Sequence, residues 1–484
     1  MAVRPLLLAL LSTFAAIAPG VAAEPRPTPA LRIQSYAFKL RNGTILPAER
    51  GTFSVPEDRR NPKSRKIEIG FVRFKSTNPH PGAPIIYLAG GPGGSGVGAA
   101  EEQRQPIFLA LRQVADVIAL DQRGVGLSNH IPPCTAPKKF EPAVTLSEAS
   151  LTTYYRDTLH YCEGEWRKAG VTIAGYNTVQ SADDIERLRQ LLGVSKVDLW
   201  GISYGTHLAL ATMRRHPKSI GRAVLASVEG MNQTVKLPLH VDAPFHRIEA
   251  VLAGGDPAKA NLTRQIAAVH AKLDAEPETF TIQSKQGSIS FRTDSFPIKM
   301  LASVAPKNPD GIAQLVGAYA ALDAGKGNAI APLLFGYFLE RPLTLYGMAE
   351  AMDIASGITD SRLLMVRARA VVSLLGTATN FPMPQLRGEL AGADLGDAYR
   401  EEVRSDIPTL VFSGDLDVRT PLEEQAEAIA GLTNKHQIIV HNGGHDLFEA
   451  HPDIPGIMID FLSGKPVTRK ELTLPAPAAA RQGG

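Results

Sequence analysis

One segment near the middle of the chain, residues 196–217 (KVDLWGISYGTHLALATMRRHP), constrains the fold more than any other. It begins with an apolar run typical of a strand buried on both faces of a parallel sheet, and it ends in a helical pattern that stops before Pro217. Between the two lies the G-x-S-x-G pattern of residues 201–205, with Ser203 at its centre. The segment therefore predicts a strand, a tight turn and a helix, with the Ser203 hydroxyl projecting above the edge of a sheet.

The same alternation of strand and helix recurs on both sides of this segment. Apolar runs at 83–91 (APIIYLAGG), 115–124 (ADVIALDQRG) and 221–230 (GRAVLASVEG) predict further strands, and 181–193 (SADDIERLRQLLG) predicts an amphipathic helix. Such alternation indicates an α/β fold with a mostly parallel central sheet and helices on both faces.

The pattern is interrupted after residue 236. Residues 237–400 predict several helices and one hairpin-like patch, and the buried-strand pattern returns at 407–421 (IPTLVFSGDLDVRTP). We therefore expect a core made of residues 24–236 and 401–470, with 237–400 inserted as a mainly helical cap domain. Residues 471–484 predict a flexible tail, because they are rich in proline, alanine and glycine.

The first 23 residues have the layout of a secretory signal peptide: Arg4, an apolar stretch from Leu6 to Ile17, and small residues that end at Ala23. The alternative is an uncleaved anchor, but the apolar stretch is short for a bilayer span and no later segment reaches roughly 20 apolar residues. We expect an exported protein, periplasmic or secreted, without stable membrane insertion.

The chain has two cysteines, Cys134 and Cys162, which permit a single pairing and exclude a zinc site built from cysteines. In an oxidising compartment we expect them to form a disulfide. The net charge of +3 over 484 residues comes without a basic block, so we expect no nucleic-acid partner.

Three side chains at the ends of predicted strands form a candidate catalytic triad. A serine hydroxyl is a poor nucleophile until a base removes its proton, so Ser203 needs a histidine and a carboxylate that orients it. His445 follows the predicted strand of KHQIIVHNGGHD, and Asp415 and Asp417 follow the strand of 407–421. Asp417 is the preferred acid, because Asp415 lies nearer the strand. The order Ser203, Asp417, His445 is the one expected for such a fold.

The glycine-rich segment 88–96 (LAGGPGGSG) is the candidate oxyanion hole. Its glycines bring bare backbone close to a substrate carbonyl, and we expect the N–H groups of Gly91 and Tyr204 to hold the oxyanion, with Gly90 as the near alternative to Gly91. A phosphate-binding loop is disfavoured, because the Lys-Ser/Thr ending of that motif is missing.

The ordered motifs GGPGGSG, DQRGVGLS, GISYGT, SGDLDVRTP and GGHD resemble those of the α/β-hydrolase peptidases of the proline iminopeptidase and tripeptidyl aminopeptidase group. The resemblance covers nearly the whole mature chain, weakly in the insert. It implies a Ser-Asp-His hydrolase with a helical cap, acting on small peptides with a free N-terminus and needing no metal or organic cofactor. Such an enzyme also needs carboxylates that bind the substrate ammonium, and Glu229, Glu350 and Asp353 are the candidates.

Two departures from the family pattern bear on the substrate. Ala89 stands where proline iminopeptidases usually have histidine, and SVEG (227–230) stands where the tripeptidyl group often has Asp-Gly. The number of residues released and the oligomeric state stay open.

The alternative function is a carboxylesterase with the same triad. A dehalogenase or epoxide hydrolase is disfavoured, because those enzymes use a carboxylate where Ser203 stands, and an idle binding protein is disfavoured by the intact triad.

Overall fold

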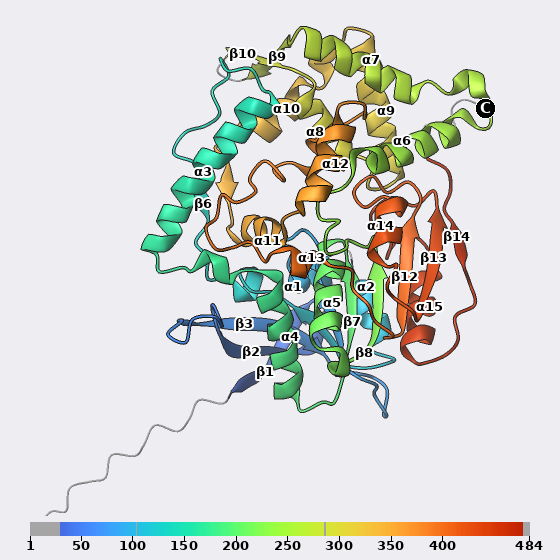
Figure 1. Cartoon of the computed structure of the whole chain (residues 1–484). Coiled ribbons are helices and arrows are strands. Elements are labelled where there is room, and N and C mark those ends of the chain that lie inside the picture. Colours follow the sequence, from blue (N-terminus) through green and yellow to red (C-terminus); the bar gives the residue numbers. More distant parts are fainter. Residues whose placement is uncertain (1–29, 103, 285–286, 478–484) are drawn as a thin grey trace, which may run out of the picture.

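The computed structural model describes residues 30–102, 104–284 and 287–477. In Figure 1 a twisted sheet with its flanking helices forms the lower part of the molecule, and a group of helices lies above it. The predicted signal peptide at 1–23 lies outside the described residues. Within the described residues, no helix has both the length and the apolar character needed to cross a membrane.

Ten strands of the described residues form one sheet, in the order β1-β2-β3-β5-β4-β7-β8-β12-β13-β14. The pairs of β1 with β2, β2 with β3 and β3 with β5 are antiparallel, and the pairs from β5 to β14 are parallel. The strands are β1 (Leu31–Lys39), β2 (Ile45–Pro56), β3 (Lys66–Phe74), β4 (Ile85–Leu88), β5 (Val117–Leu120), β7 (Val197–Ile202), β8 (Ile220–Ala226), β12 (Thr409–Gly414), β13 (Lys435–His441) and β14 (Glu471–Thr473).

The central strands are buried on both faces, as their continuous apolar runs predict. Every residue of β4, β5, β7 and β12 is buried. Alternate residues enter different clusters: Ile86 and Leu88 pack on one face of the sheet, and Ile85 and Tyr87 on the other. The predicted α/β fold with a mostly parallel sheet is confirmed.

Helices cover the two faces of the sheet. Helices α4 and α5 contribute to the first of these clusters, and α2 and α15 to the second. The helices next to the sheet are α1 (Gly96–Glu101), α2 (Gln105–Leu111), α4 (Thr178–Leu192), α5 (Tyr204–Arg215), α14 (Leu422–Ala428) and α15 (Ile454–Leu462).

The chain between β8 and β12 forms the upper part of the molecule in Figure 1. Its elements are α6 (Pro238–Ala253), α7 (Leu262–Ala275), β9 (Glu278–Ser284), β10 (Gly287–Thr293), α8 (Phe296–Val304), α9 (Pro309–Asp323), α10 (Ala331–Phe338), β11 (Thr344–Leu345), α11 (Met348–Ser356), α12 (Asp360–Ala370) and α13 (Asp397–Arg400). We call these elements the cap.

An earlier part of the chain also joins the cap. Strand β6 (Cys134–Thr135) pairs with β11, and helix α3 (Glu148–Lys168) runs beside it. Phe140 and Leu151 belong to the same apolar cluster as the cap helices. Assigning all of 24–236 to the core was therefore too simple, because this excursion carries its own apolar side chains into the cap.

The predicted disulfide between Cys134 and Cys162 is confirmed, and it joins β6 to α3.

The prediction of a flexible tail from residue 471 is wrong at its start. Residues Glu471–Thr473 form β14, parallel to β13 at the edge of the sheet. Leu472 and Leu474 anchor this strand, since both side chains are buried in the second cluster. Residues 478–484 lie outside the described residues.

Candidate active site

Ser203 stands between β7 and α5 in a strained turn. Its backbone has φ 53° and ψ −129°, a region that residues other than glycine rarely occupy. The turn brings α5 so close to β4 that a Cβ on Gly205 would lie 2.0 Å from the carbonyl oxygen of Leu88. This close approach explains the glycine, and it leaves the serine side chain at the carboxyl edge of the sheet.

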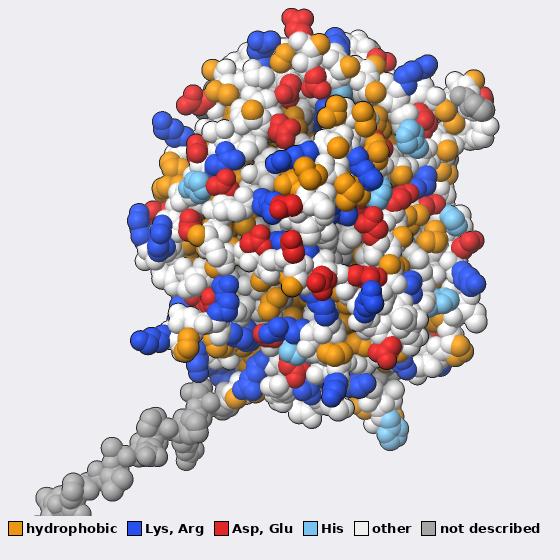
Figure 2. Space-filling view, viewed as in Figure 1, with side chains coloured by type: hydrophobic (Ala, Val, Ile, Leu, Met, Phe, Trp, Pro, Cys, Tyr) orange, Lys and Arg blue, Asp and Glu red, His pale blue; other side chains and the backbone are white. Residues whose placement is uncertain are grey.

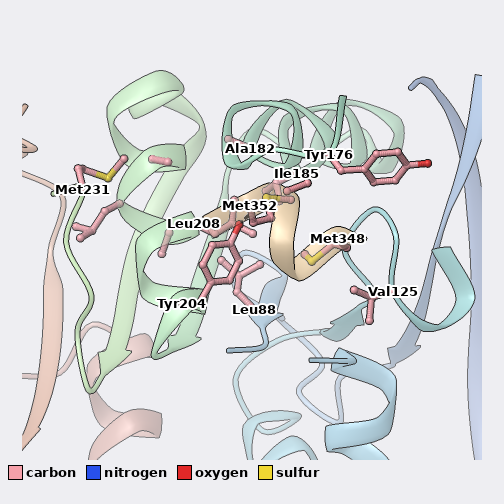
Figure 3. Close-up of a cluster of buried hydrophobic side chains, with 14 of the residues drawn as sticks. Leu88, Val125, Tyr176, Ala182, Ile185, Tyr204, Leu208, Met231, Met348 and Met352 are labelled. Carbon is pink, nitrogen blue, oxygen red and sulfur yellow. Dashed lines mark hydrogen bonds between the residues drawn. The ribbon is translucent and has the colours of Figure 1, made fainter. Parts of the chain in front are cut away.

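The side chain of Tyr204 anchors the start of α5 to the cap. Its hydroxyl lies 3.0 Å from Oγ1 of Thr178 and 3.1 Å from the sulfur of Met352, a residue of α11. Figure 3 shows the Tyr204 ring pointing toward Met352 across the buried cluster. The side chain therefore faces away from solvent, while the backbone N–H of Tyr204 lies in the first helical turn and has no intrahelical acceptor.

Asp417 and His445 meet as the sequence predicts. Nδ1 of His445 lies 2.9 Å from Oδ2 and 3.0 Å from Oδ1 of Asp417. Asp415 pairs with His441 instead, at 3.0 Å from its Nδ1. The carboxylate that orients His445 is thus Asp417, which is fully buried.

The Asp417 carboxylate is held by several donors. The backbone N–H groups of Arg419 and Thr420 donate to Oδ1 at 2.9 Å each, and the Thr420 hydroxyl donates to Oδ2 at 2.6 Å. Burial alone would raise the pKa of Asp417, but the charge and hydrogen bond of His445 and the bonds from Thr420 lower it below its ordinary value. An ionised Asp417 can fix the tautomer of His445 and stabilise the imidazolium.

The glycine-rich segment lies over the nucleophile. Gly91 has φ +124°, which favours glycine, and a Cβ there would lie 2.9 Å from the backbone nitrogen of Gly93. A Cβ on the neighbouring Gly90 would lie 3.0 Å from Cβ of Ser203. Bare backbone therefore borders the reacting group, as an oxyanion hole requires.

Ser203, His445 and Gly91 line one cavity of about 550 Å³. The remaining lining residues are Tyr87, Ala89, Gly90, Gly94, Ser95, Gly98, Ala99, Glu102, Arg104, Ile202, Val304, Lys307, Arg419 and Asp446. The cavity brings the nucleophile, the base and the glycine backbone together, so a carbonyl compound could reach all of them at once.

The cap contacts the histidine loop directly. The backbone N–H groups of His445 and Asp446 donate to the carbonyl oxygen of Lys307, at 3.0 and 3.4 Å. Lys307 follows α8 in the cap, and a Cβ on Gly444 would lie 2.3 Å from the same oxygen. The cap therefore fixes the position of the loop that carries the base.

A smaller pocket of about 60 Å³ adjoins the catalytic cavity, and Gly91 and Arg419 line both. We call it the acyl pocket. Its other lining residues are Pro92, Glu229, Thr234, Val235, Lys236, Asp353, Thr379, Asn380, Phe381 and Met383. Two of the three predicted carboxylates, Glu229 and Asp353, therefore lie beside the candidate oxyanion hole.

The two carboxylates of the acyl pocket differ in their partners. Glu229 Oε2 accepts from the Lys236 ammonium at 2.6 Å, and both side chains are buried. The Asp353 carboxylate has no hydrogen-bond or ion-pair partner among the described residues. Burial, reinforced by the nearby Glu229, raises the pKa of Asp353 to about 7, whereas Lys236 acts in the opposite direction. Asp353 is thus the carboxylate that is open to a ligand.

Glu350, the third predicted carboxylate, lies elsewhere. Its Oε2 accepts from the backbone N–H of Gly347 at 2.8 Å, which caps the first turn of α11. Burial raises the pKa of Glu350. It is absent from the lining of both cavities, so the structure gives it a role at the helix start.

Sequence reasoning missed Lys236, Arg419 and Thr420. Thr420 and Arg419 lie within the motif of the triad acid, DVRTP, so their position after Asp417 was a usable signal. Lys236 comes at the end of the first core segment, in a stretch without periodicity.

In the described part of the chain, no group of three or more His, Cys, Asp or Glu side chains is arranged to hold a metal ion.

Comparisons with known proteins agree with this geometry. A family model described as the alpha/beta hydrolase fold matches residues 83–330. The chain is 31% identical over 192 residues to a tripeptidyl aminopeptidase of Streptomyces lividans, covering 38% of this chain and 35% of that protein. It is 28% identical over 181 residues to the serine protease Hip1 of Mycobacterium tuberculosis, covering 36% and 35%. It is 30% identical over 161 residues to a probable proline iminopeptidase of Streptomyces coelicolor, covering 33% and 37%.

These alignments span about a third of the length of each curated relative. The family match is longer: it includes the glycine-rich segment, the nucleophile turn and the first part of the cap.

Proposed function

This chain belongs to the alpha/beta hydrolase fold family, and on that basis we propose that it is an exported serine aminopeptidase. It removes one or more N-terminal residues from small peptides through an acyl-enzyme. The names of the relatives above support a peptidase. The apolar leader of residues 1–23 and the disulfide support export.

In the proposed mechanism, His445 removes the hydroxyl proton of Ser203, which attacks the substrate carbonyl. Asp417 orients the imidazole and stabilises its charged form. The N–H groups of Gly91 and Tyr204 stabilise the oxyanion, and His445 then protonates the leaving amine. A water molecule attacks the acyl-enzyme with the same base, and this step releases the N-terminal product and restores Ser203.

The observation that carries the aminopeptidase assignment is the position of Asp353. Its carboxylate is open and lies in a pocket that shares Gly91 with the catalytic cavity. A free α-ammonium bound there would form a charge-assisted hydrogen bond and would set the distance from the N-terminus to Ser203. An esterase for small neutral acyl groups has no need of a carboxylate at this place.

The test is hydrolysis of matched anilides. Pro-, Ala- and Ala-Ala-Pro-p-nitroanilides are assayed with free and with acetylated N-termini, beside a short acyl p-nitrophenyl ester. The Ser203→Ala variant is the control for every substrate. Labelling with a fluorophosphonate reports whether Ser203 is an activated nucleophile.

We expect cleavage of the free anilides, little cleavage of the acetylated ones, and no activity or labelling with Ser203→Ala. The longest unit cleaved efficiently defines the residues released. If only the ester is hydrolysed, the triad is correct but the protein is a carboxylesterase. If wild-type protein is not labelled, the serine hydrolase proposal is wrong.

A further inference from the structure

Arg419 is positioned beside the candidate triad by a hydrogen bond of its own backbone. It follows the acid Asp417 by two residues, and its N–H donates to Asp417 Oδ1 at 2.9 Å. The residue lines both the catalytic cavity and the acyl pocket. Its backbone is therefore coupled to the carboxylate of the proposed triad.

The guanidinium of Arg419 has no ion-pair or hydrogen-bond partner in the residues that the structure describes. Other arginines in comparable positions are bound: Arg104, which also lines the catalytic cavity, pairs with Asp446 and Glu449 at 2.7 and 2.6 Å. Arg419 is half-buried, and its guanidinium offers five N–H donors that no protein acceptor occupies. Arg419 is thus open to an acceptor that enters the acyl pocket.

A second unpartnered polar group belongs to a residue that lines the same pocket. The Thr379 hydroxyl is buried, lines the acyl pocket, and finds no hydrogen-bond partner among the described residues. Lys236 is not open in this way, because its ammonium is bound by Glu229 at 2.6 Å and by the carbonyl oxygen of Thr234 at 2.9 Å. The free groups of the acyl pocket are therefore one anion, Asp353, and two donors, Arg419 and Thr379.

These open groups are complementary to a residue that carries both an ammonium and a carboxylate. We propose that the acyl pocket selects an N-terminal aspartate or glutamate, with Asp353 binding the α-ammonium and Arg419 and Thr379 binding the side-chain carboxylate. The inference rests on the aminopeptidase function proposed above and names its substrate class. Arg419 is a specificity-determining residue in this proposal, and the covalent steps are unchanged.

The size and chemistry of the pocket favour this class. The pocket is small, about 60 Å³, and its lining is rich in polar side chains: Thr234, Lys236, Thr379, Asn380 and Arg419 beside the carboxylates of Glu229 and Asp353. An apolar acyl residue would bury the guanidinium and the hydroxyl without partners, which costs free energy. An acidic residue satisfies both donors, and its ammonium and carboxylate are complementary to the neighbouring charges of Asp353 and Arg419.

The test compares isosteric substrates, Glu- and Gln-p-nitroanilide with free N-termini. A charge-assisted hydrogen bond predicts that wild-type protein cleaves the Glu substrate with a kcat/KM at least about tenfold higher. In Arg419→Gln the ratio should fall to about one, in Arg419→Lys it should be intermediate, and in Thr379→Val it should fall severalfold. Arg367→Gln, on the exposed face of α12, is the matched control and should keep the wild-type ratio.

Each outcome decides the proposal. A Glu/Gln ratio near one in wild-type protein overturns it, even if both anilides are cleaved. If Arg419→Gln lowers kcat/KM equally for the Glu and Gln substrates, the proposal is also overturned, since Arg419 would then bind the peptide backbone. If no free anilide is cleaved but the ester is, the aminopeptidase function itself fails. Inhibition of ester hydrolysis by free glutamate, stronger than by glutamine, provides a second readout that does not depend on the variants.

Discussion

Asp417 directs its carboxylate to His445, and Asp415, two residues earlier, directs its own to His441. Both pairs have nearly the same length, 2.9 and 3.0 Å between oxygen and Nδ1. One pair borders the catalytic cavity through His445, and the other lies at the end of β13. The two aspartates therefore form an internal comparison for the role of the triad acid.

Asp417→Asn should lower kcat by about 10⁴-fold, because the amide stabilises the wrong tautomer of the base. Asp415→Asn, the matched control, should change kcat less than about threefold. Steady-state kinetics on the best free anilide or ester measures both. Equal losses in the two variants would contradict the assignment of Asp417.

Gly91→Ala should lower kcat by about 10²- to 10³-fold, the loss observed when one oxyanion donor is displaced. The substitution forces an alanine to φ +124° and places its Cβ 2.9 Å from the nitrogen of Gly93. Gly317→Ala is the control, since a Cβ there meets nothing within 4 Å and lies within α9. Unchanged kcat in Gly91→Ala, with the fold intact by circular dichroism, would remove Gly91 from the oxyanion hole.

The preference for free N-termini should depend on pH. Because burial raises the pKa of Asp353 to about 7, this carboxyl is anionic above pH 7 and neutral below it. The ratio of kcat/KM for a free anilide to that for an uncharged ester should therefore fall as pH decreases through about 7. The ratio cancels the titration of the triad, and above about pH 8 it should fall again as the substrate amine loses its proton.

Asp353→Asn supplies the control for this profile. In this variant the ratio of kcat/KM for the free anilide to that for the ester should be low, and it should not change as pH passes through about 7. A wild-type ratio that is constant from pH 6 to 8 would show that Asp353 does not bind the ammonium.

Removing the disulfide should destabilise the fold without altering the triad. Cys134 and Cys162 are 28 residues apart, and a cross-link over such a loop contributes about 3–4 kcal/mol in the chain-entropy account. The double variant Cys134→Ser, Cys162→Ser should lose about this much free energy of unfolding, measured by urea denaturation. Wild-type protein that is denatured in urea with a reductant should have the same midpoint as the variant. A variant midpoint equal to that of oxidised wild-type protein would contradict the prediction.

His270 should make the cap sensitive to acid. Its Nε2 lies 2.7 Å from the Tyr319 hydroxyl, and burial, with the charge of Lys299, lowers its pKa to about 3. The unfolded chain binds a proton below about pH 6.5, so the stability present above that value is lost as pH falls toward 3. Near pH 4.5 the loss from this residue is about 2–3 kcal/mol.

The comparison is the free energy of unfolding at pH 7 and at pH 4.5. His270→Gln keeps a polar group at the site and removes this titration. The free energy of unfolding of this variant should therefore fall less between pH 7 and pH 4.5 than that of wild-type protein. Equal pH dependence of the two proteins would show that His270 is already charged in the fold.

The triad was predictable because each member belongs to a local pattern. Ser203, Asp417 and His445 each follow a continuous apolar run, and parallel strands bring their carboxyl ends to one edge. The same argument placed Gly91 close to Ser203. Local pattern and long-range geometry agree there, so the sequence was sufficient to bring these residues together; their catalytic role stays a prediction.

The acyl pocket was less predictable, because its side chains come from segments without periodicity. Lys236 binds Glu229 across seven residues, and Asp353 approaches them from α11, more than a hundred residues later. Glu350, three residues before Asp353, looked equally suitable but turns back to cap its own helix. Side-chain direction on a short helix in the cap depends on packing, which a motif does not encode.

The contact between Lys307 and the histidine loop ties the cap to the core beside the candidate base. Opening it at this point would break the bonds that hold the backbone of His445 and Asp446. A displacement of the cap at Lys307 would therefore also displace the backbone of the loop that carries the proposed base, so cap position and base position are coupled in this fold.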